Sequence, residues 1–449
     1  MNAFTNGSGD NLKVTYKELS ALKPRARNPR THSKEQIQQL VRSIREFGFI
    51  NPVLIDSDNG LIAGHGRVQA AKIAGLRDVP TVCVDHLTPA QIRAYMIADN
   101  KLAENAGWDR DLLALEFNEL HESGYDLTLT GYRVPEIDLL LTPNENGLTE
   151  ADEVPAVDWN KPAVSRLGDL WQIGRHFLLC GDSMKNESYQ QLLNGERAQM
   201  VFTDPPYNVR IDGHVSGLGK NTHREFAMAS GEMTEAEFVT FLETVFQNLA
   251  DSSLDGALHY ICMDWRHIEE VLKAAKKTYT KFENLCVWNK TNGGMGSFYR
   301  SKHELVFVFK NGGAPHINNV ELGKHGRYRT NVWDYPGVNT FGKDRDAELA
   351  MHPTVKPIAL VADAILDATQ RDAIVLDAFA GSGTTLLAAE KTARRGFGIE
   401  IDPHYADTII KRFSEKLKIE AVLVKTGASF EETRHKRVID AEYERVVLG

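Results

Sequence analysis

From residue 167 to about residue 420, short apolar runs alternate with longer amphipathic stretches. Buried strands typically appear as short apolar runs, whereas helices repeat apolar residues every three to four positions. The pattern predicts strands at 170–173, 176–180, 200–203, 256–263, 282–288, 304–310, 373–378 and 395–401, and helices at 235–249, 265–276, 358–369, 384–391 and 403–418. Such alternation predicts an α/β fold, with a mostly parallel sheet covered by helices on both faces.

The first part of the chain has a different pattern. A short strand at 13–16 precedes a helix that begins after Ser33, with Gln36 placed to complete a capping box. A strand, a turn at 58–60, a second helix at 68–74 and a strand at 79–84 follow. This order predicts a smaller α+β domain.

Two further segments separate and follow these domains. Residues 88–141 are predicted to be mostly helical, and the stretch from 142 to 162 is acidic and interrupted by proline and glycine, as interdomain linkers are. We therefore predict an N-terminal domain, a helical segment with an acidic linker, an α/β domain and a C-terminal tail, at residues 1–105, 106–164, 165–420 and 421–449.

Composition narrows the class of protein. A chain of 449 residues is expected to form two or three domains. No apolar run is long enough to cross a bilayer, and the polar first ten residues do not resemble a signal peptide. The four cysteines are far apart and form no Cys-x-x-Cys pair, so we expect no metal and a reducing cytoplasm.

The net charge of −9 argues against a protein that coats nucleic acid without specificity. The charge is unevenly distributed, however. Between Lys23 and Arg45 there are seven basic residues and one acid. This cluster is either a solvated surface or a place where a phosphate backbone docks.

The stretch Thr203-Asp204-Pro205-Pro206-Tyr207 directly follows an apolar strand. Paired prolines end a strand and stiffen the chain, because proline fixes φ and lacks an N–H. The resulting arch offers a carboxylate, free carbonyls and an aromatic ring, which suit a flat molecule that carries an amino group. An ordinary strand-ending turn is the alternative interpretation of these residues alone.

A second motif follows the strand at 373–378. Ala378-Phe379-Ala380-Gly381-Ser382-Gly383-Thr384-Thr385 leads into a helix, and its glycines let the backbone pass close beneath a ligand. Leu386 breaks the dinucleotide fingerprint, and the phosphate-loop lysine is missing, so a nucleoside with little phosphate fits better than NAD or ATP. Glu400, at the tip of the next strand, is placed to bind ribose hydroxyls.

With these motifs in this order, residues 165–420 resemble the beta class of amino-group DNA methyltransferases, which use S-adenosylmethionine. In that permuted class the Asp-Pro-Pro-Tyr motif precedes the Phe-Ala-Gly-Ser-Gly-Thr-Thr motif. Gly181-Asp182 matches the family element at the cofactor adenine, and 352–357, which contains Lys356, matches the element at the methionine end. The resemblance implies a Rossmann-like methyltransferase sheet.

The resemblance also implies roles for individual residues. The implied catalytic residues, around a flipped base, are Asp204, Pro205, Pro206 and Tyr207. The implied cofactor-binding residues are Asp182, Lys356, Asp377, Phe379, Gly381, Ser382, Gly383, Thr384 and Glu400. In the beta class the region before His352 recognises DNA, and there we expect Arg327 and Arg329 to contact it.

Residues 18–105 resemble the N-terminal domain of ParB- and sulfiredoxin-like proteins, on Asn28-Pro29-Arg30 and the segments 49–53, 63–67 and 75–80. The Gly64-His65-Gly66-Arg67 turn opens a helix, where backbone N–H groups can face an anion. Nucleotide-binding members of that family carry a glutamate and paired arginines in this loop, but here only Arg67 is present. The resemblance therefore implies DNA docking or regulation, with Arg67 as a DNA-binding residue.

These observations predict a site-specific adenine methyltransferase of the restriction–modification type that acts on double-stranded DNA, with a homodimer as one possible assembly. In the family, aspartate in Asp-Pro-Pro-Tyr accompanies adenine. One alternative is the same fold acting on the cytosine amino group of DNA, or on a glutamine or an RNA base. Another is a ParB-like DNA-binding regulator whose methyltransferase half is inactive, although Asp204, Tyr207 and Glu400 are intact.

Overall fold

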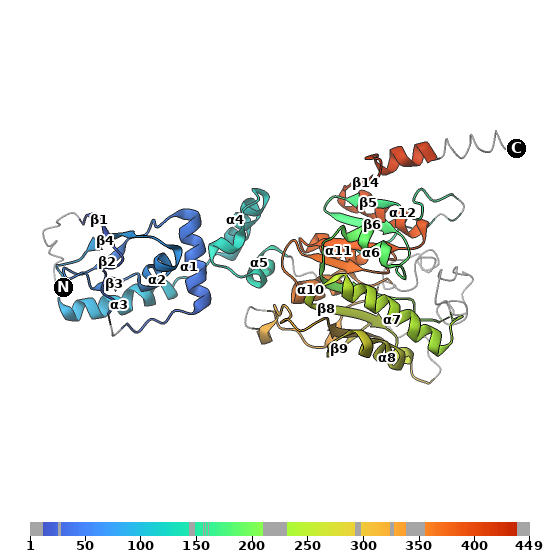
Figure 1. Ribbon diagram of the computed structural model, residues 1–449, viewed down its shortest axis with the longest axis horizontal. Helices are drawn as coiled ribbons and strands as arrows, with labels where there is room; N and C mark the ends of the chain where they lie inside the picture. Colours follow the sequence, from blue (N-terminus) through green and yellow to red (C-terminus); the bar gives the residue numbers. More distant parts are fainter. Residues whose placement is uncertain are drawn as a thin grey trace. The chain divides into compact units, whose positions relative to one another are not determined.

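The protein is described from a computed structural model. The structure describes residues 12–25, 28–142, 149–155, 157, 159, 161–209, 231–291, 298–323, 327–337 and 355–437. The chain separates into two compact units, Met1–Leu141 and Thr142–Gly449 (Figure 1). Within the described ranges, no helix combines the length and the apolar character that a membrane span requires.

Unit 1 contains a four-stranded sheet flanked by helices. The strand order is β1 (Val14–Glu18), β4 (Asp78–Cys83), β2 (Val53–Ile55) and β3 (Leu61–Ala63). The helices are α1 (Lys34–Phe47), α2 (His65–Ala74), α3 (Pro89–Glu104), α4 (Arg110–Glu122) and α5 (Val134–Leu141). Ser33 caps α1 by accepting a hydrogen bond from Gln36 N, so the predicted helix start and the α+β class are confirmed.

Unit 2 is built on one ten-stranded sheet. Its order is β11 (Val332–Asp334), β9 (Lys281–Asn289), β10 (His303–Lys310), β8 (Ser253–Met263), β7 (Ala198–Thr203), β12 (Ile374–Asp377), β13 (Arg395–Glu400), β6 (His176–Cys180), β5 (Leu170–Ile173) and β14 (Ala421–Leu423). The five central strands, from β8 to β6, are parallel, whereas β10, β5 and β14 run antiparallel to their neighbours. The predicted α/β class is confirmed.

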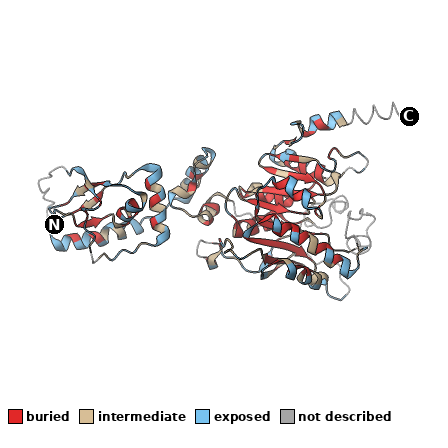
Figure 2. Ribbon diagram, in the orientation of Figure 1, coloured by how far each residue is buried: buried red, intermediate tan, exposed pale blue. Residues whose placement is uncertain are grey.

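Helices cover both faces of this sheet. One face packs against α10 (Ile358–Ala368), α11 (Thr384–Lys391) and α12 (Pro403–Arg412), and the other against α6 (Asn186–Leu193), α7 (Glu235–Asp251) and α8 (Ile268–Thr278). Alternate strand residues point to opposite faces. In β7, Met200 and Phe202 join the first core, while Val201 joins the second. Figure 2 shows the strands buried between helices whose outer surfaces are exposed.

Three predicted boundaries need correction. Residues 421–423, assigned from the sequence to a tail, form β14 and extend the sheet. The helix predicted at 403–418 ends at Arg412, because residues 413–417 form a wider turn that closes at Lys418 with φ of 59°. The helix predicted at 265–276 begins at Ile268, because Asp264 caps a separate short turn at Trp265–His267.

Part of the predicted acidic linker packs on unit 2. Asp152 is buried, and its Oδ1 accepts a hydrogen bond at 2.7 Å from the backbone N–H of Ile358, which is the first residue of α10. Its Oδ2 accepts one from Thr149 N at 2.8 Å. Arg412, fully buried in α12, donates from Nη2 to the Ala151 carbonyl at 2.7 Å. This segment therefore satisfies polar groups that unit 2 buries.

We predict that Asp152→Ala lowers the free energy of unfolding of unit 2 by about 1–3 kcal/mol, because it leaves the Ile358 N–H buried without an acceptor. The neighbouring control is Glu153→Ala, whose side chain is 68% exposed and pairs with Lys416. That change should cost less than about 0.5 kcal/mol. Calorimetric melting of the two variants measures the difference, and equal melting would show that the segment contributes nothing to unit 2.

Candidate active site

The two sequence motifs meet at one edge of the sheet. Strands β7, β12, β13 and β6 are neighbours and parallel, so their carboxyl ends lie together. One pocket opens there. It is lined by the arch after β7, the loop after β12, Glu400 and Asp402 after β13, and Gly181 after β6.

A buried carboxylate joins the first two loops. Asp377 Oδ1 accepts hydrogen bonds from Thr203 Oγ1 at 2.8 Å and from Phe379 N at 3.0 Å, and Oδ2 accepts one from Thr385 Oγ1 at 2.6 Å. Burial is the largest influence and raises the pKa of Asp377 to about 6. Because Thr203 directly precedes the arch, this carboxylate fixes the arch relative to the glycine-rich loop.

Glu400 lies at the other side of the pocket and is 7% exposed. Its Oε2 accepts a hydrogen bond from Gly381 N at 2.8 Å, and its Oε1 accepts one from Asp402 N at 2.9 Å. Burial outweighs these two donors and raises the pKa of Glu400 to about 8. Each carboxylate oxygen keeps acceptor capacity that can face a ligand.

The arch carries a group of charges. Tyr207 Oη donates to Asp204 Oδ1 at 2.6 Å, and the ammonium of Lys356 donates to Asp204 Oδ2. The same ammonium lies 2.9 Å from Glu304 Oε2, and Lys290 pairs with Glu304 Oε1. Two carboxylates and two ammonium groups thus alternate in a chain, so their formal charges cancel.

The ionisation of these groups reflects their pairing. Burial raises the pKa of Asp204, against the opposing effect of Lys356. Burial also disfavours the Glu304 carboxylate, but Lys356 and Lys290 outweigh it and lower the pKa of Glu304 to about 2. Asp204 and Glu304 in turn outweigh the burial of Lys356 and raise the pKa of its ammonium. Glu304 and Lys356 are therefore a charged pair at neutral pH.

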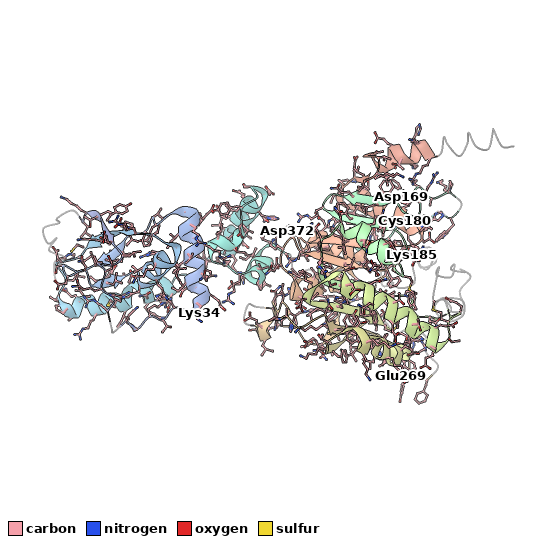
Figure 3. The ribbon with its side chains drawn as sticks, viewed as in Figure 1. Lys34, Asp169, Cys180, Lys185, Glu269 and Asp372 are labelled. Carbon is pink, nitrogen blue, oxygen red and sulfur yellow. The ribbon has the colours of Figure 1, made fainter. Side chains whose placement is uncertain are left out.

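The structure brings most of the predicted catalytic and cofactor residues into this pocket, but Asp182 and Gly383 do not line it. Asp182 Oδ1 instead accepts a hydrogen bond from Met184 N at 2.9 Å in the turn after β6, close to Lys185, which is labelled in Figure 3. Gly383 caps α11 with φ of 84°, and a Cβ there would lie 2.8 Å from Ile409. Both residues shape loops beside the pocket.

The predicted DNA-binding arginines of unit 2 have carboxylate partners. Arg327 is 8% exposed and donates from Nη2 to Asp367 Oδ1 at 2.6 Å. Arg329 Nε donates to Asp367 Oδ2 at 3.0 Å, and its Nη1 donates to Asp363 Oδ2 at 3.2 Å. This network ties the segment before β11 to α10, so the structure places both arginines in packing contacts, where a phosphate would have to displace a carboxylate. Of the other residues in this region, Tyr328 is 83% exposed and Trp333 is buried. Residues 324–326 and 338–354 lie outside the described ranges.

In unit 1, Arg67 lines a polar cleft together with Asn28, His65, Asp99 and others. Burial lowers the pKa of Arg67, and its Nη2 lies 3.4 Å from the Pro52 carbonyl. Several members of the basic cluster at 23–45 also have partners. Arg25 pairs with Asp56, and Arg30 pairs with Glu104.

Three residues in the pocket or beside it were not assigned to the site from the sequence. Glu304 was predicted only as the first residue of a strand, and Lys290 follows the strand predicted at 282–288. An acid at the head of the apolar run of β10 is nevertheless a signal of a buried, paired carboxylate. Trp159 was read as part of a linker. It lines the pocket, with its ring centroid 4.9 Å from that of His404 and 5.8 Å from that of Tyr405.

A parallel sheet with an acid-tipped strand and a glycine-rich loop beside an Asp-Pro-Pro-Tyr arch defines a nucleoside-binding group-transfer enzyme of the methyltransferase class. Three models of known protein families match parts of this chain. A model described as DNA methylase matches residues 198–412, the ParB N-terminal domain model matches 5–100, and the ParB-methyltransferase HTH domain model matches 111–167. The chain belongs to the family of DNA amino-methyltransferases that use S-adenosylmethionine, and carries a ParB-like N-terminal domain.

Individual relatives cover the two units separately. Type II methyltransferase M.ScaI of Streptomyces caespitosus is 38% identical over 56% of this chain and 88% of its own length. The ParB-like nuclease domain-containing protein YnaK of Escherichia coli is 50% identical over 18% of this chain and 94% of its own. DNA adenine methyltransferase YhdJ of Escherichia coli is 27% identical over 48% of this chain and 76% of its own length.

Among solved structures, the M1.HpyAVI–SAM complex is similar over 53% of this chain and 98% of its own, with 21% identity and a TM-score of 0.39.

We predict that Trp159→Ala weakens the binding of S-adenosylmethionine about three- to tenfold, because an aromatic contact contributes roughly 0.5–1.5 kcal/mol. Trp159→Phe should retain most of the affinity. Titration calorimetry on the full chain measures both, with Trp108→Ala as the control because Trp108 lies in unit 1 and is 72% exposed. Unchanged affinity in Trp159→Ala would show that this side chain does not contact the cofactor.

Proposed function

We propose that the protein transfers a methyl group from S-adenosylmethionine to the exocyclic amino group of adenine in double-stranded DNA. The observation that carries the proposal is the juxtaposition of the arch and the glycine-rich loop. They follow the adjacent strands β7 and β12, and the bond from Thr203 to Asp377 joins them. A methyl donor and an amine can therefore be held side by side in one pocket.

The residues at the pocket suit this cofactor. Glu400 offers two acceptor oxygens for ribose hydroxyls, and the loop from Phe379 to Ser382 forms the adjacent wall. S-adenosylmethionine supplies a methyl group bonded to a positively charged sulfur. Lys356 is the ammonium at the pocket that fits the cofactor carboxylate, although here it is paired with Asp204.

The arch is suited to activating an amine. The adenine amino group is a poor nucleophile because its lone pair is delocalised into the ring. Hydrogen bonds from its two N–H groups to the Asp204 carboxylate and the Pro205 carbonyl favour a tetrahedral nitrogen with an available lone pair. Tyr207 can stack on the base, which offsets part of the cost of flipping it, on the order of a few kcal/mol. After transfer, Asp204 can accept the proton that the nitrogen loses.

The choice of adenine over cytosine rests on the motif. Asp-Pro-Pro-Tyr accompanies adenine in the resemblance drawn above, and one relative is named as an adenine methyltransferase. The family model spans both kinds of target, so the cytosine amino group of DNA is the second candidate. The intact charge pairs around Asp204 favour an active enzyme over an inactive regulator.

For unit 1 we propose a role in docking the enzyme on DNA. The polar cleft around Arg67 contains two buried nitrogen atoms, His65 Nε2 and Arg67 Nε, that lack hydrogen-bond partners among the described residues. Such atoms favour a polar or anionic ligand at the cleft. We further propose the cytoplasm as the compartment, in keeping with four free cysteines.

We predict that DNA incubated with the protein and methyl-labelled S-adenosylmethionine acquires label on adenine, identified after digestion to nucleosides. Asp204→Asn should reduce the rate at least about 100-fold while leaving cofactor affinity within about twofold, because the lost interaction is made with the reacting amine. Asp255→Asn is the control, because Asp255 lies near the amino end of β8 and does not line the pocket. Label on cytosine would select the second candidate, and no label on any DNA would refute the proposal.

We predict that cofactor affinity depends on Glu400 ionisation. With its pKa raised to about 8, Glu400 is mostly neutral at pH 7 and ionised at pH 9. Ribose hydroxyls donate best to the ionised form, so affinity should rise with pH, by at most about tenfold per unit below pH 8. In Glu400→Gln, which has no carboxylate to ionise, this rise of affinity with pH should be absent. The dissociation constant for S-adenosylmethionine is measured for both proteins from pH 6.5 to 9. If the ratio of the Glu400→Gln value to the wild-type value does not change with pH, Glu400 does not bind the ribose as an ionised group.

A further inference from the structure

The catalytic carboxylate is already engaged in the structure. Asp204 Oδ1 accepts a hydrogen bond from Tyr207 Oη at 2.6 Å, and Oδ2 accepts one from Lys356 Nζ. An ammonium in contact with a carboxylate weakens it as an acceptor for a neutral amine. It also repels the positive charge that develops on the amine nitrogen as a methyl group is added. In this arrangement Asp204 is poorly prepared for the reaction proposed above.

Both donors have a second acceptor within reach, and it is the same atom. Glu304 Oε2 lies 2.9 Å from Lys356 Nζ and 3.4 Å from Tyr207 Oη. The four side chains form a closed ring of contacts, with each donor placed between the two carboxylates. Across the ring, Lys356 Nζ lies 3.4 Å from Tyr207 Oη. A small shift of the ammonium and hydroxyl groups therefore moves them from one carboxylate to the other without breaking the ring.

Glu304 is held in place for this role. It is the second residue of β10, paired in register with Trp288 of β9, and its side chain is only 10% exposed. Its other oxygen is bound by Lys290, whose ammonium lies 4.5 Å from the centre of the Trp288 ring. Since β10 runs antiparallel to β8, its amino end reaches the edge of the sheet where the arch lies.

We propose that Glu304 is a positioning residue that takes Lys356 and Tyr207 from Asp204 when the target base enters. Asp204 is then free to accept the amine N–H and to face the positive charge that forms on the nitrogen. Lys290 keeps Glu304 fixed and ionised throughout. This inference rests on the proposed function, and Glu304 itself contacts neither the base nor the cofactor.

The test compares Glu304→Gln with Glu304→Asp and the wild-type full chain. Glu304→Gln keeps the shape but removes the negative charge that competes with Asp204 for the ammonium, so the single-turnover rate of methyl transfer should fall about 100-fold. Affinities for cofactor and DNA should stay within about twofold, which a misfolded site would not allow. Glu304→Asp should recover part of the rate. The control is Glu283→Gln, which removes a carboxylate of β9 that pairs with Lys281.

A double variant separates positioning from general stability. With Glu304→Gln in place, the carboxylate left to Lys356 is Asp204, so at saturating S-adenosylmethionine the addition of Lys356→Gln should lower the single-turnover rate by less than Lys356→Gln does in the wild-type chain. Residues in contact couple in stability whatever their role, so the two losses are compared in the single-turnover rate and not in the free energy of unfolding. Additive losses, or a Glu304→Gln rate equal to wild type, would overturn the inference.

A crystal structure tests the change of partner of Lys356 even if the proposed function is refuted. If wild-type protein binds S-adenosylmethionine but labels no DNA, the proposed function is refuted. Crystals grown with adenosine, with S-adenosylhomocysteine filling the cofactor side of the pocket, then still show whether Lys356 changes partner. The inference expects Lys356 Nζ closer to Glu304 than to Asp204 in that complex, and an ammonium that remains on Asp204 overturns it.

Discussion

The hydrogen bond from Thr203 Oγ1 to Asp377 Oδ1 joins the two loops on which the proposed chemistry depends. It is possible because β7 and β12 are neighbours in a parallel sheet, although they are far apart in the chain. Both strands end at the same edge, so the arch and the glycine-rich loop face each other without any long connecting structure. Asp377 is buried with three donors, which makes this junction one of the most constrained points of the pocket.

The second constraint is electrostatic. Charges buried in a protein are costly unless they are paired, and removing one partner leaves the other exposed to that cost. Around the arch, Asp204, Lys356, Glu304 and Lys290 alternate in sign, which satisfies the constraint with no net charge. Because Lys356 contacts both carboxylates, a substrate that binds at the arch can influence which of the two it pairs with.

The sequence was informative about the fold because strand and helix periods are local properties, and most strands of unit 2 form where apolar runs predict them. The pocket was predictable where motifs are contiguous, as at Asp204-Pro205-Pro206-Tyr207 and at Phe379–Ser382. It was not predictable where partners come from distant elements. Glu304 reaches the arch only because β10 is antiparallel to β8, and Arg327 turns toward Asp367 only because α10 packs beside it. Neither relation is encoded in a short stretch of residues.

The edge of the sheet of unit 2 has a consequence for the order of its motifs. Strands β5 and β14, near the two ends of this unit, pair with each other, and Val424 N donates to the Leu170 carbonyl at 2.9 Å. The polypeptide thus nearly closes on itself, so a short bridge across this pair would produce a circular chain that can be opened at another surface loop. Rearrangement of a gene in this way alters which motif is translated first while leaving every strand with its neighbours. The fold therefore tolerates a catalytic arch that precedes the cofactor loop as well as one that follows it.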